Sequence, residues 1–149
     1  MSSNHIENLK IREFKITDYD YAYSLWCETE NLCLENTSSR EIIIRYLNRN
    51  PGISSVAEVN GQIIGTILVG HDGYRAHVKY LAVKKDIRGQ GVAKALIERS
   101  LACLQDEQIK IIYLSIKDEN PLVINFWKKF GFITYQDSFP KVTLMCSER

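Results

Sequence analysis

The apolar and polar positions of the first third of the chain predict one strand and two helices. Apolar and charged residues alternate weakly over residues 9–14, which is typical of an edge strand. Apolar residues then recur at helical spacing from Tyr21 to Trp26, and Thr17 or Asp18 can cap this helix. A second helix is predicted over residues 39–48, because Ser38 and Glu41 have the spacing of a capping box at its start.

The middle of the chain carries the pattern of an antiparallel hairpin ladder. Strand-like stretches cover residues 53–59, 62–69 and 75–83. The pairs Asn60-Gly61 and Asp72-Gly73, both strong signals for a tight hairpin turn, separate them. We therefore expect three consecutive antiparallel strands.

The last third predicts helices and strands in alternation. A helix is expected from about Gly91 to Leu104 and a strand over residues 110–116, and this crossover would add one parallel pair to the sheet. A further helix is expected from Asn120 to Gly131, and residues 132–135 and 142–146 resemble two closing strands. The predicted fold class is α+β, with a mixed, mostly antiparallel central sheet and flanking helices.

Composition narrows the class of protein. The chain has 149 residues, which suits a single domain over residues 1–149, and its 45% hydrophobic and 25% charged residues are ordinary for a globular protein. A formal net charge of +1 gives no support to a nucleic-acid partner. The four cysteines form no CxxC pair, so we expect no metal site and reduced thiols in a cytoplasmic protein. No apolar run approaches the roughly 20 residues that span a bilayer, so no membrane partner is expected.

The stretch Ile87-Arg88-Gly89-Gln90-Gly91-Val92-Ala93 predicts a phosphate-binding turn. It joins a predicted strand to a predicted helix, and glycines there leave room for a ligand beside helix amides that attract anions. The spacing of a P-loop is absent. A dinucleotide fingerprint also fails, because its sixth position is Lys94 and the turn follows a hairpin ladder, not a parallel βαβ unit.

The pattern that remains, Arg-x-x-Gly-x-Ala at Arg88, Gly91 and Ala93, resembles that of the GNAT superfamily of acetyl-CoA-dependent N-acetyltransferases. The stretch 120–132 is similar to a second segment of that family, Asn-x-x-Ala-x-x-Phe-Tyr-x-Lys-x-Gly-Phe. Residues 56–73 resemble a small bacterial YpeA-like subgroup. The resemblance implies a GNAT-like sheet in which a bulge splays one strand from the next, so that pantetheine lies in the opening.

The resemblance also implies which residues hold acetyl-CoA as the co-substrate, with no metal. Backbone amides of the turn would bind the pyrophosphate, and the Val83 N–H would lie near the thioester carbonyl as a small oxyanion hole. Lys84 and Lys85 add positive charge for the phosphates. The implied cofactor-binding residues are Leu81, Ala82, Val83, Arg88, Gly89, Gln90, Gly91, Val92, Ala93, Lys94, Asn120 and Trp127.

The candidate catalytic residues are His77, Tyr80 and Glu58. His77 stands where some family members have a Glu, and its ordinary pKa suits a general base. A surface strand residue is at least as good an interpretation of His77 from the sequence alone. Trp127 departs from the family, which usually has a Tyr here that is assigned as the acid protonating the departing thiolate. Trp127 cannot take that role, because an indole N–H does not give up its proton. Asn120 is also interpreted as a helix N-cap, which is compatible with a place near the pantetheine.

The function predicted from these residues is transfer of an acetyl group from acetyl-CoA to a primary amine, by direct attack in a ternary complex. The alternative is a non-catalytic acyl-CoA-binding regulatory module. The amine acceptor belongs to a small molecule or to a protein, and a homodimer is kept open. Trp26, Glu30, Glu35 and the hairpin tip around Asp72 are candidates to wall the acceptor site.

Overall fold

The computed structural model describes residues 6–30, 32, 34–35, 38–135, 143 and 145–147. The chain divides into two compact units, Met1–Ser115 and Ile116–Arg149. The single domain expected over residues 1–149 stays a prediction.

Within the described residues, the first unit is built on a five-stranded sheet in the order β1-β2-β3-β4-β5. The first four strands pair antiparallel, and β5 joins β4 in parallel. The predicted α+β class and mixed sheet are therefore confirmed. The strands are β1 (Leu9–Glu13), β2 (Ser55–Val59), β3 (Gln62–His71), β4 (Arg75–Val83) and β5 (Ile111–Leu114).

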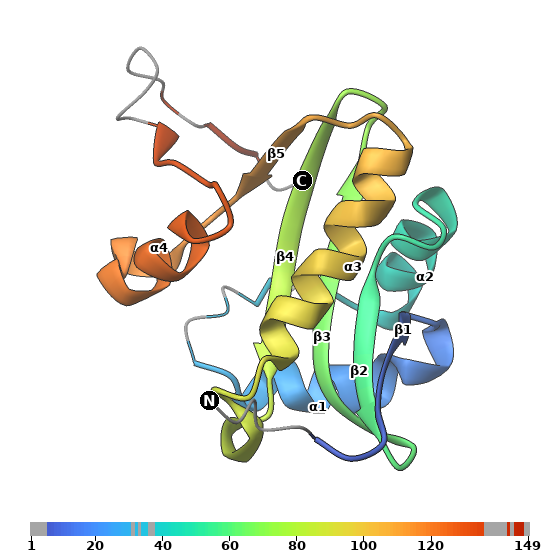
Figure 1. Ribbon diagram of the computed structural model, residues 1–149. Coiled ribbons are helices and arrows are strands. Elements are labelled where there is room, and N and C mark those ends of the chain that lie inside the picture. The colour runs from blue at the N-terminus through green and yellow to red at the C-terminus, as the bar shows by residue number, and fades with distance from the viewer. Residues whose placement is uncertain are drawn as a thin grey trace. The chain divides into compact units, whose positions relative to one another are not determined.

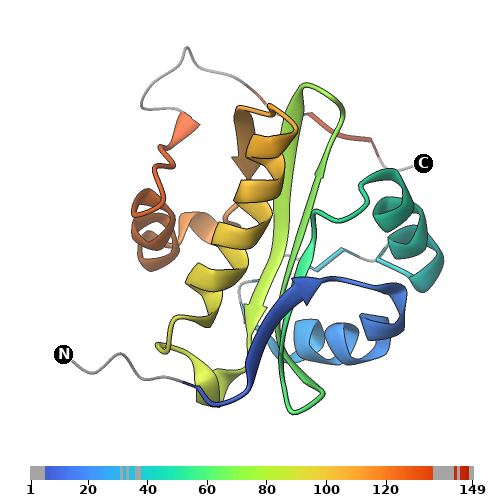
Figure 2. The ribbon, with the colours of Figure 1, turned by 45° about the vertical axis from the view of Figure 1, so that its right-hand side comes forward.

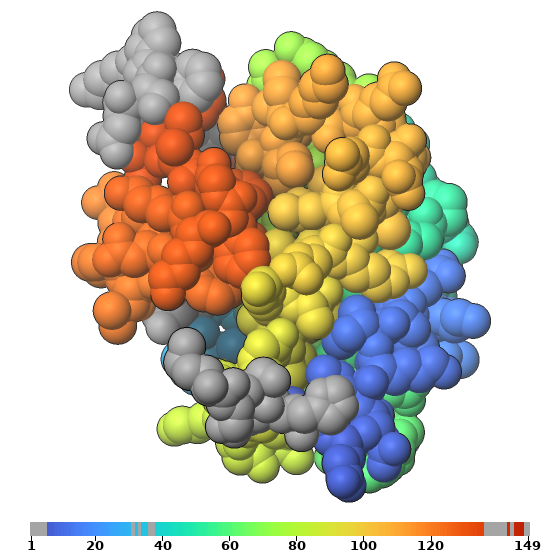
Figure 3. Space-filling view, in the orientation of Figure 1, coloured from blue at the N-terminus to red at the C-terminus, as the bar shows by residue number. Residues whose placement is uncertain are grey.

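Helices cover both faces of this sheet (Figures 1 and 2). The helices α1 (Tyr19–Glu28) and α2 (Arg40–Arg49) lie on one face, and α3 (Val92–Asp106) lies on the other. Figure 3 shows α3, coloured yellow to orange, at the surface on this side of the sheet. Two 3-10 turns, η1 (Ile16–Asp18) and η2 (Lys85–Ile87), precede α1 and α3.

Two glycines of β3 mark these two faces. A Cβ on Gly65 would lie 3.0 Å from the Leu96 side chain of α3, whereas a Cβ on Gly70 would lie 2.7 Å from the Tyr46 hydroxyl of α2. Odd positions of β3 in this stretch therefore face α3, and even positions face α1 and α2. Each face has its own apolar layer. Trp26, 1% exposed, stacks against Phe14 on the α1 side, and Leu96 and Leu104 are fully buried on the α3 side.

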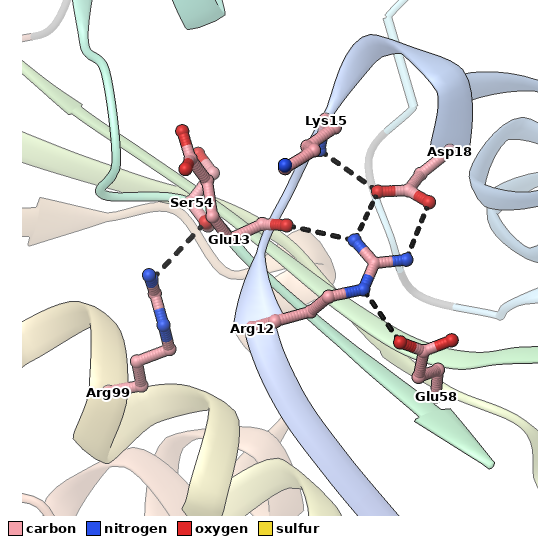
Figure 4. A network of polar contacts seen from close by, with 7 residues as sticks. All are labelled: Arg12, Glu13, Lys15, Asp18, Ser54, Glu58 and Arg99. Carbon is pink, nitrogen blue, oxygen red and sulfur yellow. Dashed lines mark hydrogen bonds and ion pairs between the residues drawn. The ribbon is translucent and has the colours of Figure 1, made fainter. Parts of the chain in front are cut away.

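An ion-pair network fastens the N-terminal strand to its neighbours (Figure 4). Arg12 donates two hydrogen bonds to the Asp18 carboxylate, at 2.8 and 2.9 Å, and a third to Glu58 at 2.8 Å. The same carboxylate accepts the Lys15 N–H at 2.9 Å. This network joins β1, η1 and β2, and Asp18 is only 6% exposed within it.

The second unit contains η3 (Lys117–Glu119) and α4 (Pro121–Lys128). The strand predicted over residues 132–135 is wrong, because the structure forms no strand there. These residues follow the end of α4. The Phe132 N–H bonds to the Trp127 carbonyl and the Gly131 N–H to the Lys128 carbonyl, the pair of bonds that closes a Schellman motif, with Gly131 at φ +88°. The Phe132 ring packs on Trp127 at 5.1 Å. Phe132 therefore completes the helix end instead of starting a strand.

The last predicted strand, over residues 142–146, falls partly outside the described residues. The described positions 143, 145 and 146 lie in no strand. Alternating apolar residues indicate strand propensity, but a strand forms only where a partner offers its backbone.

Candidate functional site

The predicted phosphate-binding turn connects β4 to α3. Gly89 and Gly91 both have left-handed backbones, with φ of +80° and +87°, which an ordinary residue adopts only with strain. A Cβ built on either glycine meets no heavy atom of the described residues within 4 Å. The glycines are needed for the path of the chain, and the space over them is open.

The start of α3 points free donors into this space. Its first hydrogen bond runs from the Ala95 N–H to the Gly91 carbonyl, at 3.1 Å. The amides of Val92, Ala93 and Lys94 precede that bond, so the helix itself offers them no acceptor. Val92 is 1% exposed and anchors this turn of helix on the sheet. Convergent amides at an open helix N-terminus are the donor set that a pyrophosphate requires, so the residues present fit coenzyme A.

Arg88 is held at both ends of its guanidinium. Its Nε donates to the Val83 carbonyl at 2.9 Å, and its Nη1 pairs with the Glu30 carboxylate just after α1. This contact lowers the pKa of Glu30, chiefly through the hydrogen bond from Arg88. The sequence predicts the Arg88 site but not this partner, because nothing in a linear pattern joins residues 30 and 88. Glu30 thus contacts the turn, although the sequence suggests it for the acceptor site.

A bulge interrupts β4 next to the turn. Thr66 of β3 pairs with Ala82 and Leu68 pairs with Lys79, so Ile67 faces two residues of β4, Tyr80 and Leu81. Tyr80 takes up the extra length with a φ of +53°. Bulges of this kind often stand beside active sites, where they redirect the strand.

The edge of β4 beyond the bulge is open in the described residues. The parallel ladder to β5 ends at Val78, paired with Leu114, whereas β4 continues to Val83. In Figure 1, β5 ends beside the upper part of β4. On the other side, the Lys84 N–H bonds to the Ile64 carbonyl at 2.8 Å, and Val83 pairs with Gly65. Because bonded and non-bonded pairs alternate, Val83 directs its N–H away from β3, toward the open edge.

The structure places the ten expected cofactor residues of the first unit along one continuous stretch. Leu81, Ala82 and Val83 end β4. Arg88, Gly89 and Gln90 form the turn, Gly91 is the N-cap of α3, and Val92, Ala93 and Lys94 are its first residues.

Asn120 and Trp127 belong to the second unit. The Asn120 side chain accepts the Leu122 N–H at 3.0 Å with Pro121 at the first helical position, so the predicted N-cap is confirmed. Trp127 is 6% exposed and contacts the rings of Phe126, Phe130 and Phe132. Their predicted contacts with the cofactor stay predictions.

The three candidate catalytic residues lie apart. His77 is exposed on β4, and partial desolvation, followed by the charge of Lys79, lowers its pKa against a smaller raising effect of Glu35. Glu58 forms an ion pair with Arg12. In the sheet, Glu58 is opposite Ile63 of β3 and His77 is opposite Gly70, seven residues further along β3. That spacing separates Glu58 from His77 by roughly 20 Å along β3.

The Tyr80 phenol lies inside the core. It is 4% exposed, its ring lies 4.8 Å from Trp26, and its hydroxyl accepts the Glu35 N–H at 3.0 Å and bonds Ser38. The hydroxyl therefore has protein partners. The catalytic roles proposed for Tyr80, Glu58 and His77 stay predictions.

The described residues contain neither a candidate metal centre nor a helix able to cross a bilayer. No group of three or more His, Cys, Asp or Glu side chains gathers there in a way that suits a metal ion. In the same residues, every helix is too short or too polar to cross a bilayer.

Known proteins resemble this chain over most of its length. The sequence model described as "Acetyltransferase (GNAT) family" matches residues 16–132. Acetyltransferase ECA0875 of Pectobacterium atrosepticum is 36% identical over 126 residues, which cover 85% of this chain and 89% of the relative. The YpeA-like subgroup stays a prediction.

Two solved structures share the fold. The crystal structure of Ard1 from Thermoplasma volcanium has a TM-score of 0.73 at 24% identity, covering 85% of this chain and 83% of its own. The NatC complex bound to Gag peptide and CoA has a TM-score of 0.66 at 25% identity, covering 85% of each chain. These shared folds agree with the family match and with the open glycine turn. The family match and the 36% identical relative show that the chain belongs to the acetyltransferase (GNAT) family and is an acyltransferase that takes its acetyl group from acetyl-CoA.

Proposed function

We propose that this enzyme acetylates a primary amine by direct attack of the amine on acetyl-CoA, with both substrates bound at once. The observation that carries the proposal is the open edge of β4 running into an open glycine turn. One ligand with an extended arm and a pyrophosphate matches that combination. The amine acceptor stands on a small molecule or a protein, and the cytoplasm is the proposed location.

The β4–α3 stretch is the proposed donor site. The amides of Val92, Ala93 and Lys94 bind the pyrophosphate, and basic residues around the turn supply charge. The Val83 N–H, directed to the open edge, donates to the thioester carbonyl and stabilises the negative charge that develops on its oxygen. In the second unit, Asn120 and Trp127 are proposed neighbours of the pantetheine.

His77 is the proposed base. As the amine nitrogen bonds to the acetyl carbon, the C–S bond breaks, the thiolate leaves, and the ammonium proton passes to the imidazole through a chain of water. The relay is needed because Gly70, the partner of His77, lies five residues along β3 from Gly65, the partner of Val83, which is roughly 17 Å. A lysine-like amine with a pKa near 10.4 needs roughly 4.6 kcal/mol to lose its proton at pH 7, so a base contributes most for such an acceptor. Glu58 and Tyr80 are the weaker candidates, since one is paired with Arg12 and the other is bonded inside the core.

Trp127 is not proposed as the acid that protonates the departing thiolate. A thiol has a pKa of roughly 8.5, so the thiolate is a tolerable leaving group without a proton donor. The absence of a phenol at this position is therefore compatible with a working enzyme, although the alternative of a non-catalytic acyl-CoA-binding module would explain it as well.

Steady-state kinetics tests the proposal. Thiol release from acetyl-CoA is measured with spermidine, lysine, glutamate and a peptide with a free N-terminus as acceptors. We expect at least one acceptor to turn over and to give intersecting double-reciprocal lines, as a ternary complex requires. Parallel lines would indicate a covalent acyl-enzyme. Micromolar binding of coenzyme A without turnover of any acceptor would favour the binding module.

A pair of glycine variants tests the donor site. Gly91→Ala should weaken coenzyme A binding, because the left-handed turn relaxes and moves the amides. Gly61→Ala is the matched control, since Gly61 has a φ of +80° and open space in the β2–β3 hairpin. Both should lose about 1 kcal/mol of stability. Equal effects of the two variants on the coenzyme A Kd would contradict the proposed site.

A further inference from the structure

The Arg88 side chain lies along the open edge of β4. Val83 and Gly65 form a non-bonded pair, so Val83 directs its carbonyl as well as its N–H away from β3. The Arg88 Nε donates to that carbonyl at 2.9 Å. The guanidinium therefore lies next to the N–H that is proposed to hold the thioester carbonyl.

Glu30 contacts the other end of the same guanidinium. The Arg88 Nη1 donates to the Glu30 carboxylate while its Nε donates to Val83. Two hydrogen bonds and the width of one guanidinium place the nearest Glu30 oxygen within about 8 Å of the Val83 carbonyl oxygen. The proposed base, His77, stands roughly 17 Å from Val83 along the sheet. Glu30 is therefore a carboxylate set much closer to the proposed position of the thioester.

The ion pair between Glu30 and Arg88 is suited to open when a phosphate binds. Both side chains are substantially exposed, so separating them costs little stability. A pyrophosphate on the adjoining turn carries more negative charge than one carboxylate, and a guanidinium binds phosphate oxygens with two N–H groups at once. Coenzyme A therefore competes with Glu30 for Arg88.

Arg88 is also the group that chiefly neutralises Glu30. Its hydrogen bond is the largest cause of the lowered pKa of Glu30, and Lys85 has the smallest effect of the groups that lower it. When Arg88 turns to a phosphate, the carboxylate stays ionised, because the ordinary pKa of a glutamate, about 4.3, lies far below neutral pH. The open edge then has an anionic group that has lost its strongest partner.

We propose that Glu30 is the binding residue for the acceptor, whose ammonium group donates a hydrogen bond to the Glu30 carboxylate once coenzyme A has bound Arg88. A carboxylate oxygen and its ammonium partner lie about 3 Å apart, so the amine is held at the edge where the acetyl group is proposed to lie. This inference rests on the proposed function and names its acceptor class, an amine that binds as a cation. Glu30 holds the ammonium, and the proton leaves by the proposed chain of water.

Glu30→Gln tests the inference by separating the acceptor from the cofactor. At saturating acetyl-CoA, kcat/KM for the best acceptor of the spermidine, lysine, glutamate and peptide panel should fall about ten- to hundredfold, because a charge-assisted hydrogen bond is lost. The Kd for coenzyme A should not weaken, and the melting temperature should hardly change. Glu30→Asp keeps the charge and should retain more of the kcat/KM than Glu30→Gln.

Glu28→Gln is the matched control. Glu28 is exposed at the end of α1, so this variant removes the same charge without touching Arg88, and its kcat/KM should stay near that of the unmodified enzyme. An equal fall in Glu28→Gln would assign the effect to net charge and overturn the inference. An unchanged kcat/KM in Glu30→Gln would overturn it too, while the proposed function would stand. If no acceptor turns over in the unmodified enzyme, the proposed function itself fails and takes the inference with it.

The release of Glu30 from Arg88 gives a second measurement. In calorimetric titrations, the best acceptor of the panel should bind the unmodified enzyme about fivefold or more tightly in the presence of coenzyme A than in its absence. The gain should be smaller in Glu30→Gln, which has no carboxylate to release. Equal affinities of the unmodified enzyme with and without coenzyme A would show that Arg88 does not give up Glu30, and the inference would be wrong.

Discussion

The side-chain hydroxyl of Thr66 donates a hydrogen bond to the main-chain carbonyl of Tyr80, at 2.9 Å, where β4 carries its extra residue. The same hydroxyl accepts the indole N–H of Trp26, also at 2.9 Å. Thr66 is fully buried. One hydroxyl therefore connects α1 to the bulge and holds the backbone that leads to the open edge of β4.

Replacing Thr66 with valine tests this connection. Thr66→Val keeps the shape but leaves the Trp26 N–H and the Tyr80 carbonyl without their partner, so we expect a loss of about 2–4 kcal/mol in the free energy of unfolding. The KM for acetyl-CoA should rise as the bulge relaxes. Urea denaturation and steady-state kinetics measure the two effects. Thr66→Ser keeps the hydroxyl, so it should retain most of the free energy of unfolding and a KM for acetyl-CoA near that of the unmodified enzyme. Equal changes in Thr66→Ser and Thr66→Val would show that the hydroxyl is not responsible.

The bulge also shows why the sequence predicts the strand but not its faces. Buried residues alternate through β4 at positions 76, 78, 80 and 82, as one uninterrupted strand would have them. Yet Val78 pairs with Val69 on the α3 face, and Ala82 pairs with Thr66 on the α1 face. The extra residue at the bulge reverses the faces while the alternation continues. Periodicity alone carries no sign of this reversal.

Local signals predict elements well and partners poorly. The glycine turn, the hairpins and the Asn120 cap depend on neighbouring residues, and all are present in the structure. The sequence predicts Ser38 as the cap of α2, but the Ser39 hydroxyl accepts the Ile42 N–H instead, and Ser38 bonds the Tyr80 hydroxyl. The contact of Glu30 with Arg88 likewise joins distant positions. Such choices depend on tertiary packing, which a linear pattern does not contain.

The Glu30–Arg88 pair predicts a change in cofactor affinity. Glu30→Gln frees positive charge at the turn, so we expect coenzyme A to bind about two- to fivefold more tightly at low ionic strength, and less so at high salt. Stability should hardly change, because both side chains are substantially exposed. Glu28→Gln removes the same charge from the exposed end of α1 and is the control. Calorimetric titration with coenzyme A measures the difference; an equal gain in the control would point to net charge alone.

The network in Figure 4 predicts a local stability effect. Asp18→Asn removes the charge that pairs with the partly buried Arg12, and we expect a loss of about 2 kcal/mol in the free energy of unfolding. Asp20→Asn is the control, because that carboxylate is 85% exposed and lies 3.9 Å from Arg40. Urea denaturation of both variants gives the comparison. Equal free energies of unfolding in the Asp18→Asn and Asp20→Asn variants would contradict the role given to the network.

The lowered pKa of His77 predicts the pH dependence of turnover. A base acts only when neutral, so kcat should fall as the pH drops through the pKa of His77, which lies below its ordinary value of about 6.5. Lys79→Gln removes a charge that lowers this pKa, so the acid limb should move to higher pH, while Lys79→Arg keeps the charge and should leave it in place. His77→Gln should lower kcat about 100-fold or more and abolish the limb. The measurement is kcat against pH at saturating acceptor, because a limb that belongs to the amine itself would move with the acceptor chosen. A limb that survives in His77→Gln would assign the proton transfer to another group.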